Sequence, residues 1–158
     1  MAKKSVKIKA YTNVIEEYVA NAAITPGHLI QIMSTDKVRV HASAGQNALP
    51  MFALEDELQG KGIDEAYAAT DRVQCWVPNR GDVVNAVLKN GETIVIGDFL
   101  ESAGDGTLQK HIADVDSSND ITWVYPLQIV GQAIVALDLS GSSGADALVG
   151  NRIQIRIV

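Results

Sequence analysis

The segment Arg152-Ile153-Gln154-Ile155-Arg156-Ile157-Val158 decides the fold class, because it alternates polar and apolar residues more strictly than any other part of the chain. Successive side chains of a β-strand point to opposite faces of a sheet, so a strand with one buried face needs this period of two. The same alternation recurs at Val6–Tyr11, His28–Met33, Lys37–His41 and Arg72–Val77. The turn residues Ser34-Thr35-Asp36 predict a hairpin between the second and third of these. The chain is therefore expected to be mainly β.

Short strands are also expected at Pro50–Leu54, Val83–Leu88, Thr93–Ile96 and Phe99–Ser102, with more of them in Trp123–Leu139. About ten short strands separated by turns indicate a small β-barrel-like or β-sandwich-like domain and not a βαβ protein. Glycine-centred corners precede three of the strands, at Gly27, Gly81 and Gly97. Glycine permits a positive φ or a close crossing of two chain segments, which the corners of small barrels need.

One short helix is expected over residues 63–69, Ile63-Asp64-Glu65-Ala66-Tyr67-Ala68-Ala69, where an acid near the start suits the helix dipole. The segment Val14–Ala23 is compatible with either a short helix or an extended arm. Thr25-Pro26-Gly27 ends it in both cases. The predicted organisation is an extended N-terminal arm over residues 1–24 and a single β-rich body over residues 25–158.

Composition and charge limit the partners. Of the 158 residues, 47% are hydrophobic and only 5% aromatic, which suits one domain with an aliphatic core. The net charge of −6 argues against nucleic acid and against an anionic membrane as partners. Lys3, Lys4, Lys7 and Lys9 nevertheless precede the first acid, Glu16. This basic segment is either a solubilising terminus or an arm that pairs with an acidic partner surface.

The cysteine count and the apolar runs indicate where the protein is made. Cys75 is the only cysteine, so no internal disulfide is possible and a reducing cytoplasm is compatible. No apolar run approaches the roughly 20 residues that span a bilayer. The basic start of the chain has no apolar stretch behind it, so it does not predict a secretory signal. We expect synthesis and assembly in a cytoplasm.

Catalytic groups are scarce in the sequence. The histidines, His28, His41 and His111, are far apart and none has metal-ligand spacing, so neither a metal nor another cofactor is expected. Cys75 alternates with Val73 and Val77 and is expected to point into the core as a small hydrophobe. Nucleophile-elbow, phosphate-loop and dinucleotide motifs are lacking. The sequence predicts a protein that is not an enzyme.

Two further features are candidates for contact surfaces. Glu55-Asp56-Glu57 is the densest acidic cluster, and because neighbouring residues of an extended chain point apart, a solvated loop is favoured over a cation site. Trp76 points away from Val73, Cys75 and Val77 if the strand is regular. An outward tryptophan is either part of a second core or an interface anchor.

The stretch Pro50–Tyr67, which contains the phrase GKGIDEAY, resembles a segment of the capsid decoration (cement) proteins of tailed bacteriophages. The likeness covers about residues 26–137 and the last strand, and it depends on the order and spacing of several phrases, none of which is a chemical signature. The other phrases are Val73–Pro78, Arg80–Asn85, Ile96–Ser102, Gly104–Leu108 and Gly131–Leu137.

This resemblance implies a small β domain that binds the outer surface of an expanded phage head and clamps neighbouring subunits of the major capsid protein. Such proteins often form trimers at local threefold positions and less often dimers at twofolds. The resemblance therefore implies a non-enzymatic protein of the virion, present in the host cytoplasm during assembly.

For a decoration protein, two sets of residues are the expected contacts. The capsid-binding arm would use Lys3, Lys4, Lys7, Lys9 and Tyr11. The interface candidates in the body are Trp76, Glu55, Asp56 and Glu57. Two alternatives stay open, a phage tail or connector ring subunit and a small hydrolase that uses Cys75 or the Glu55–Glu57 cluster.

Overall fold

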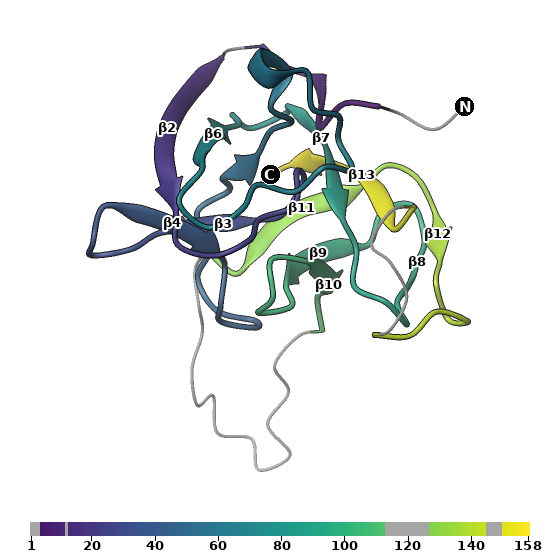
Figure 1. The fold of residues 1–158 in the computed structure, drawn as a ribbon. Coiled ribbons are helices and arrows are strands. Elements are labelled where there is room, and N and C mark those ends of the chain that lie inside the picture. The colour runs from purple at the N-terminus through teal and green to yellow at the C-terminus, as the bar shows by residue number, and fades with distance from the viewer. Residues whose placement is uncertain (1–3, 12, 113–126, 145–149) are drawn as a thin grey trace.

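The structure, a computed structural model, describes residues 4–11, 13–112, 127–144 and 150–158, and it is mainly β, as the alternating segments predict (Figure 1). Its six-stranded sheet has the order β1-β7-β13-β11-β9-β10. These strands are β1 (Lys7–Lys9), β7 (Val83–Val87), β13 (Arg152–Ile157), β11 (Ile129–Ala133), β9 (Phe99–Ser102) and β10 (Leu108–Lys110).

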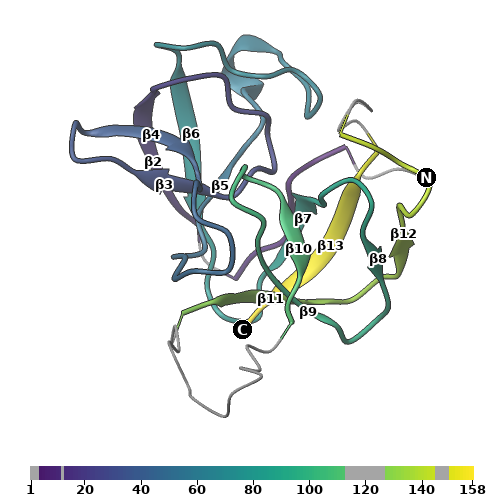
Figure 2. The same ribbon diagram turned by 90° about the horizontal axis from the view of Figure 1, so that it is seen from below.

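A five-stranded sheet and a two-stranded sheet complete the fold. The five-stranded sheet has the order β3-β4-β2-β6-β5, and the two-stranded sheet pairs β12 with β8. Their bounds are β3 (Ile30–Ile32), β4 (Lys37–Val40), β2 (Val14–Ala20), β6 (Arg72–Val77), β5 (Phe52–Ala53), β12 (Leu137–Asp138) and β8 (Thr93–Ile94). The two larger sheets form neighbouring groups of strands, with β2, β4 and β6 in one and β7, β13 and β11 in the other (Figure 2).

Both larger sheets curl, so that segments that are not neighbours in the strand order approach each other. In the five-stranded sheet, Leu29 and Phe52 form an isolated bridge, and the N–H of Ile30 donates to the carbonyl oxygen of Met51 at 2.9 Å. In the six-stranded sheet, an isolated bridge joins Leu88 to Leu108. Further backbone hydrogen bonds lie beside these bridges, such as those from Gly27 to Ala53 at 2.7 Å and from Lys89 to Leu108 at 2.9 Å. However, β3 is not paired with β5, nor β7 with β10, so the described strands form no closed barrel.

Strand β6 separates two hydrophobic clusters. Val73 and Cys75 belong to the cluster inside the curl of the five-stranded sheet, whereas Trp76 belongs to the larger cluster that includes residues of β7, β13 and β11. Cys75 and Trp76 both have 0% exposure. The expectation that Cys75 points into the core is confirmed. Trp76 lies in the second core and is not exposed as an interface anchor.

The three predicted glycine corners share one turn geometry. In Thr25–His28, Asn79–Asp82 and Val95–Asp98, the N–H of the fourth residue donates to the carbonyl oxygen of the first, at 3.1, 3.0 and 3.2 Å. The third residue is glycine with φ of +88°, +94° and +97°, a region that side chains disfavour. The prediction of positive φ at these corners is confirmed.

The side chain of the fourth residue also closes each turn. His28 Nδ1 accepts from the N–H of Thr25 at 3.3 Å, where the other two corners use aspartate. Asp82 and Asp98 accept from the first N–H of their own turns at 2.8 and 3.0 Å. Asp82, with 0% exposure, also accepts from the N–H of Tyr11 at 2.8 Å, so it ties the end of the N-terminal segment to this corner.

The corner at Gly27 lies against the six-stranded sheet. A Cβ atom on Gly27 would be 2.6 Å from Arg152 Nη1 and 3.0 Å from the carbonyl oxygen of Asn85. The guanidinium of Arg152 donates to the carbonyl oxygens of Pro26 at 2.8 Å and Ile63 at 2.6 Å. Arg152 therefore links β13 to two loops that flank the five-stranded sheet.

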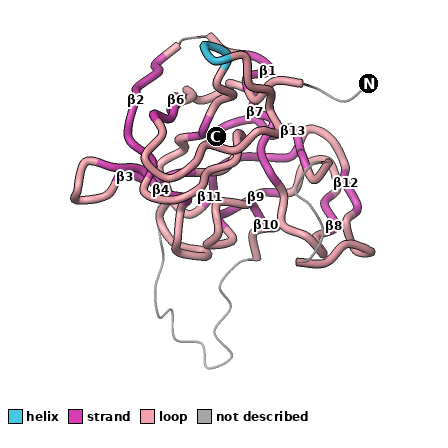
Figure 3. The backbone as a smooth tube through the Cα atoms, in the orientation of Figure 1, coloured by secondary structure: helices cyan, strands magenta, loops and turns pink. Residues whose placement is uncertain are grey.

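The helix expected over residues 63–69 is wrong. Tyr67 instead forms an antiparallel bridge with Ile24, and its hydroxyl donates to the carbonyl oxygen of Leu54 at 3.0 Å. These tertiary contacts override the local helix preference. Among the described residues, helix occurs only as the short 3₁₀ segment η1 (Glu57–Gln59), which Figure 3 shows among loops and strands. In the parts described, no helix has the length and apolar character needed to cross a bilayer.

The described part of residues 1–24, expected as an extended arm, contributes two strands to the sheets of the body. β1 pairs with β7, and β2 pairs with β6 along Val14–Val19. Val6, Ala20 and Ile24 have 0% exposure. The segment Val14–Ala23, for which helix and extended chain were both open, is therefore largely strand.

Candidate interaction site

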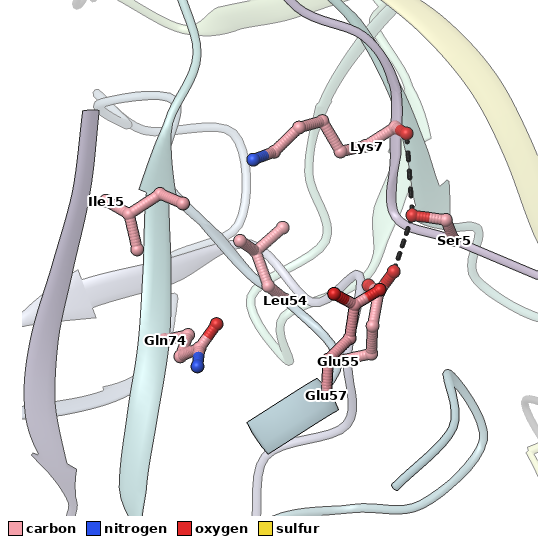
Figure 4. A pocket seen from close by; sticks show the side chains of 7 residues that line it. All are labelled: Ser5, Lys7, Ile15, Leu54, Glu55, Glu57 and Gln74. Atoms are coloured by element: carbon pink, nitrogen blue, oxygen red, sulfur yellow. Dashed lines mark hydrogen bonds between the residues drawn. The ribbon is translucent and has the colours of Figure 1, made fainter. Parts of the chain in front are cut away.

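A hollow of about 220 Å³ lies on the surface between Lys7 of β1 and Ile15 of β2 (Figure 4). Residues from four segments meet there, namely the N-terminal segment, β2, the loop after β5, and β6. The lining residues are Ser5, Lys7, Ile15, Leu54, Glu55, Glu57 and Gln74. The structure thus brings the predicted arm next to the predicted acidic cluster.

Glu55 binds the N-terminal segment to the body. Its carboxylate accepts from the Ser5 hydroxyl at 2.5 Å and from the N–H of Val6 at 3.1 Å. The Glu55 residue is only 6% exposed. A buried carboxylate needs such donors to offset its lost hydration, so this contact is structural.

The expectation of a solvated acidic loop is therefore wrong for two of the three acids. Asp56 is 5% exposed, and its backbone carbonyl accepts from the N–H of Lys61 at 3.0 Å. The Asp56 carboxylate lies 3.9 Å from Lys61 Nζ. Glu57, by contrast, is exposed at the start of η1 and at the rim of the hollow. Of the acidic cluster, Glu57 is the residue that a partner can reach.

The lysines of the predicted arm lie in different surroundings. Lys7 Nζ lies 5.5 Å from the centroid of the Trp76 ring, within cation–π range, so it covers the second core. Lys9 Nζ lies 5.1 Å from the ring of Tyr11, which is 66% exposed. Lys4 is exposed, and Lys3 lies outside the described residues. Lys4, Lys9 and Tyr11 therefore remain available for contact.

Sequence reasoning did not identify Ser5, Ile15, Leu54 and Gln74 as site residues. Ile15 is 43% exposed although it is a large aliphatic residue, and it belongs to a strand whose pattern does not alternate. Gln74 and Leu54 lie on neighbouring strands or loops, joined by the N–H of Leu54 donating to the carbonyl oxygen of Gln74 at 2.8 Å. Only the pairing of strands across the sequence reveals that these residues meet.

The described lining of the hollow contains carboxylate, hydroxyl and amine groups but neither histidine nor cysteine. Burial raises the pKa of the Cys75 thiol to about 12, so the thiol stays protonated and unreactive at neutral pH. The described residues also contain no group of three histidine, cysteine, aspartate or glutamate side chains that could hold a metal ion.

One serine–histidine pair lies elsewhere, in the interior. The imidazole of His41 and the hydroxyl of Ser102 are 2.7 Å apart, and both residues are buried. Burial lowers the pKa of His41, and its Nε2 lies 3.1 Å from the carbonyl oxygen of Asn47. A substrate would have to reach a Ser102 hydroxyl with 0% exposure, so the pair serves to join β9 to the loop after β4.

No protein-family model matches the chain, and no curated protein sequence matches it. A solved structure that is similar in fold is the N base of the head fibre protein gp8.5 of bacteriophage phi29. The two share a TM-score of 0.55 at 13% sequence identity, over 93% of this chain and 95% of that one. At this identity the likeness is one of fold, and it extends over nearly the whole of both chains.

Proposed function

We propose that the protein is a capsid decoration protein, which binds the outer surface of an expanded phage head and bridges neighbouring subunits of the major capsid protein. The observation that carries this proposal is the fold shared with the phi29 head fibre base over nearly the full length of both chains. The order of sequence phrases from Pro50 to Leu137 supports the same role.

The chemistry of the surface is compatible with this role. Lys4, Lys9 and Tyr11 are exposed, and the exposed Glu57 lines the hollow. Aromatic side chains such as that of Tyr11 are enriched in contacts between proteins, and charged side chains are typical of the polar rim of such contacts. The protonated thiol of Cys75 and the enclosed His41–Ser102 pair argue against the hydrolase alternative.

A homo-oligomer, with a trimer favoured and a dimer possible, would strengthen such contacts. Linking weak binding surfaces on one rigid assembly can raise the overall affinity by roughly 10²–10⁴ without new contacts. Exposed lysine contacts are screened by salt beyond about 8 Å at physiological ionic strength. Binding to the shell should therefore weaken as salt is added.

The test uses expanded heads that lack the protein. Adding the purified full chain should give saturable binding and heads that rupture at a higher temperature, with the added density on the outer shell in electron micrographs. The variant Lys4→Glu/Lys9→Glu/Tyr11→Ala should bind more weakly, and Lys89→Glu is the control for a charge change elsewhere. Heads that rupture at the same temperature with and without the protein would overturn the proposal. Density confined to the tail or connector would identify the ring subunit alternative.

A further inference from the structure

Strand β2 leaves part of one edge unpaired. β6 pairs with it from Val14 to Val19, whereas β4 pairs only with Val19 and Ala20. On the side away from β6, none of the described segments forms a backbone hydrogen bond with residues 14–18. Figure 1 shows β2 at the periphery of the molecule, with β6 on its inner side. In the part of the chain that the structure describes, no segment pairs with this side of Val14–Glu17, and all four residues are exposed.

The hydrogen bonds at the end of β2 show which backbone groups face outward. The N–H of Ala20 donates to the carbonyl oxygen of Asp71 at 2.8 Å, so the backbone of Ala20 faces β6. The N–H of Asn21 donates to Val38 at 2.8 Å, so the backbone of Asn21 faces β4. Backbone groups alternate in direction along a strand, and the β2–β6 register has no bulge. Ile15 and Glu17 therefore direct their N–H and C=O groups away from β6.

The side chains along this edge are apolar and acidic. Val14 and Ile15 are 46% and 43% exposed, which is unusual for large aliphatic residues next to each other on a strand. Glu16 and Glu17 are also exposed. The Tyr18 hydroxyl donates to Glu16 Oε2 at 3.0 Å and holds that carboxylate on one face of the strand.

We propose that the edge Val14–Glu17 is a docking site for an extended polypeptide segment with alternating apolar and basic side chains. The segment pairs with the outward backbone groups of Ile15 and Glu17 and so adds a strand to the five-stranded sheet. Successive side chains of a strand point to opposite faces, so Ile15 and Glu17 lie on one face and Val14 and Glu16 on the other. The basic side chains of the segment lie on the face of Glu17, and its apolar side chains lie on the face of Val14. The proposal rests on the proposed function for the source of the segment, which would be the shell protein.

Charge decides between this occupant and a second copy of β2. Pairing two antiparallel copies along the same edge, centred on Glu16 or Glu17, would bring that glutamate of one copy opposite the same glutamate of the other. Like charges opposite each other destabilise a strand pair, whereas opposite charges stabilise it. The chain as a whole carries a net charge of −6, which further favours a basic partner.

A different role for the two glutamates is to guard the edge, because charged residues often protect sheet edges from unwanted pairing. The two roles differ in what a basic strand does. If Glu16 and Glu17 recognise a partner, a basic strand binds to the edge, and reversing the charge of either glutamate weakens that binding. If they only guard, a basic strand does not bind, and removing their charge causes self-association.

The experiment follows amide hydrogen exchange of the full chain by NMR. The probe is a synthetic peptide, Lys-Val-Lys-Val-Lys-Val-Lys, whose sequence does not occur in this chain. The control peptide has glutamate in place of each lysine. Without peptide, the amides of Glu16 and Tyr18 should exchange slowly and those of Ile15 and Glu17 fast. At saturation the basic peptide should slow exchange at Ile15 and Glu17 by about tenfold or more, because hydrogen-bonded amides exchange only on opening. The acidic peptide should leave them unchanged.

Two variants test the contacts separately. Glu17→Lys should weaken binding of the basic peptide by about tenfold. A change of this size is expected when an attractive cross-strand pair becomes repulsive. Glu65→Lys makes the same charge change at an exposed residue that lines neither the edge nor the hollow, and it should leave binding unchanged. Ile15→Pro removes one outward N–H, which sheet edges tolerate, and should abolish protection of Glu17. Retained tryptophan fluorescence of the variant shows that it has folded.

Three results would overturn the proposal. Exchange at Ile15 and Glu17 that does not respond to the basic peptide would show that the edge accepts no such strand. Equal protection by both peptides would remove the role of charge. Protection that grows with the concentration of the chain alone would identify a second copy as the occupant. Each result concerns the isolated chain, so it is distinguishable from failure of binding to phage heads.

Discussion

Gly27 has no space for a side chain, because its Cβ would lie 2.6 Å from Arg152 Nη1 and 3.0 Å from the carbonyl oxygen of Asn85. Gly97 has a similar φ, +97° against +88°, but nothing lies within 4 Å of its would-be Cβ. Alanine substitutions at the two glycines therefore distinguish the cost of backbone strain alone from the cost of strain together with a steric clash. Both were predicted as corners from the sequence, but the difference between them depends on β13 and β7.

Gly27→Ala should lower the free energy of unfolding by about 2–4 kcal/mol, since strain and a clash with backbone and a buried guanidinium act together. Gly97→Ala should cost about 1 kcal/mol from the positive φ alone. Urea unfolding followed by tryptophan fluorescence measures both. Equal losses would show that the corner at Gly27 has room to relax.

His28 makes stability depend on pH. Burial lowers the pKa of His28 to about 4 from an ordinary 6.5, although the negative charge of Asp105 opposes the shift. Its Nδ1 accepts a hydrogen bond from Thr25, which requires the neutral ring. The imidazole of His28 therefore binds a proton more tightly in the unfolded chain than in the folded one. The stability due to neutral His28 is complete above the unfolded pKa and is lost as pH falls toward the folded pKa.

As the pH falls from 6.5 to 4, the cost of keeping His28 neutral should lower the free energy of unfolding by up to about 3 kcal/mol. His28→Asn supplies an acceptor for Thr25, as Asp82 and Asp98 do in the equivalent turns, but it does not titrate. Unfolding by urea at several pH values should therefore give a flatter pH dependence for the variant than for the wild type. Parallel curves would contradict the prediction.

Residues whose environment is local were predictable, and residues that depend on distant partners were not. The position of Cys75 followed from its alternation with Val73 and Val77. The burial of Glu55 did not follow, because Ser5 and Val6 come from a segment about fifty positions away. An acidic triplet read alone resembles a solvated loop.

At the scale of elements, strands with one buried face were predicted well. β6 and β9 match their expected ranges, and the hairpin of β3 and β4 forms around Asp36. β2 was left open between helix and extended chain because Val-Ile-Glu-Glu-Tyr does not alternate. A strand exposed on both faces at an open edge has no reason to alternate. The irregular pattern is itself the sequence signal of that edge.

The N-terminal segment is a structural element of the body and not only a contact arm. Deleting residues 1–9 removes β1, which pairs with β7, and the buried side chain of Val6. It also leaves the Glu55 carboxylate without its two donors. We expect a loss of about 3 kcal/mol or more in the free energy of unfolding, measured by urea.

Lys7→Ala/Lys9→Ala, which keeps the backbone of β1, is the control and should cost less than about 1 kcal/mol. An unchanged urea midpoint after the deletion would show that the segment is an arm, as the sequence suggested. Loss of shell binding by the deletion alone would therefore not prove that the segment contacts the capsid, because the deletion also weakens the body.

At the scale of the whole molecule, one side chain joins the two larger sheets. Arg152 extends from β13 to the carbonyl oxygens of Pro26 and Ile63, and its side chain is 8% exposed. Arg156 lies on the same strand but is exposed. Alternation predicts which of β13's apolar residues are buried, but it does not predict that a buried arginine connects the sheets.

Arg152→Leu should lower the free energy of unfolding by about 2–4 kcal/mol, because two buried carbonyl groups lose their donor. Arg156→Leu, the matched change at an exposed position, should cost less than about 0.5 kcal/mol. Urea unfolding compares the two variants. Similar small losses would show that water replaces the Arg152 contacts at no cost.

The global arrangement was beyond sequence reasoning for a physical reason. The mainly β fold class could be predicted from local periodicity. The curls of the sheets, however, are made by contacts such as Leu29–Phe52 and Leu88–Leu108. Such pairings depend on residues that are 20 or more positions apart, and local patterns do not encode which strands meet. The same limit applies to the hollow, whose lining comes from four separate segments.

The burial of Cys75 has a practical consequence. The chain has one thiol, and it lies inside the curl of the five-stranded sheet with 0% exposure. A thiol reagent can modify the native protein only when that sheet opens, so the rate of modification reports how often opening occurs. Cys75 can therefore be used to measure how often the five-stranded sheet opens. Because Cys75 reacts slowly in the native protein, a cysteine introduced on the surface would be the single fast-reacting site for attaching a dye or a cargo.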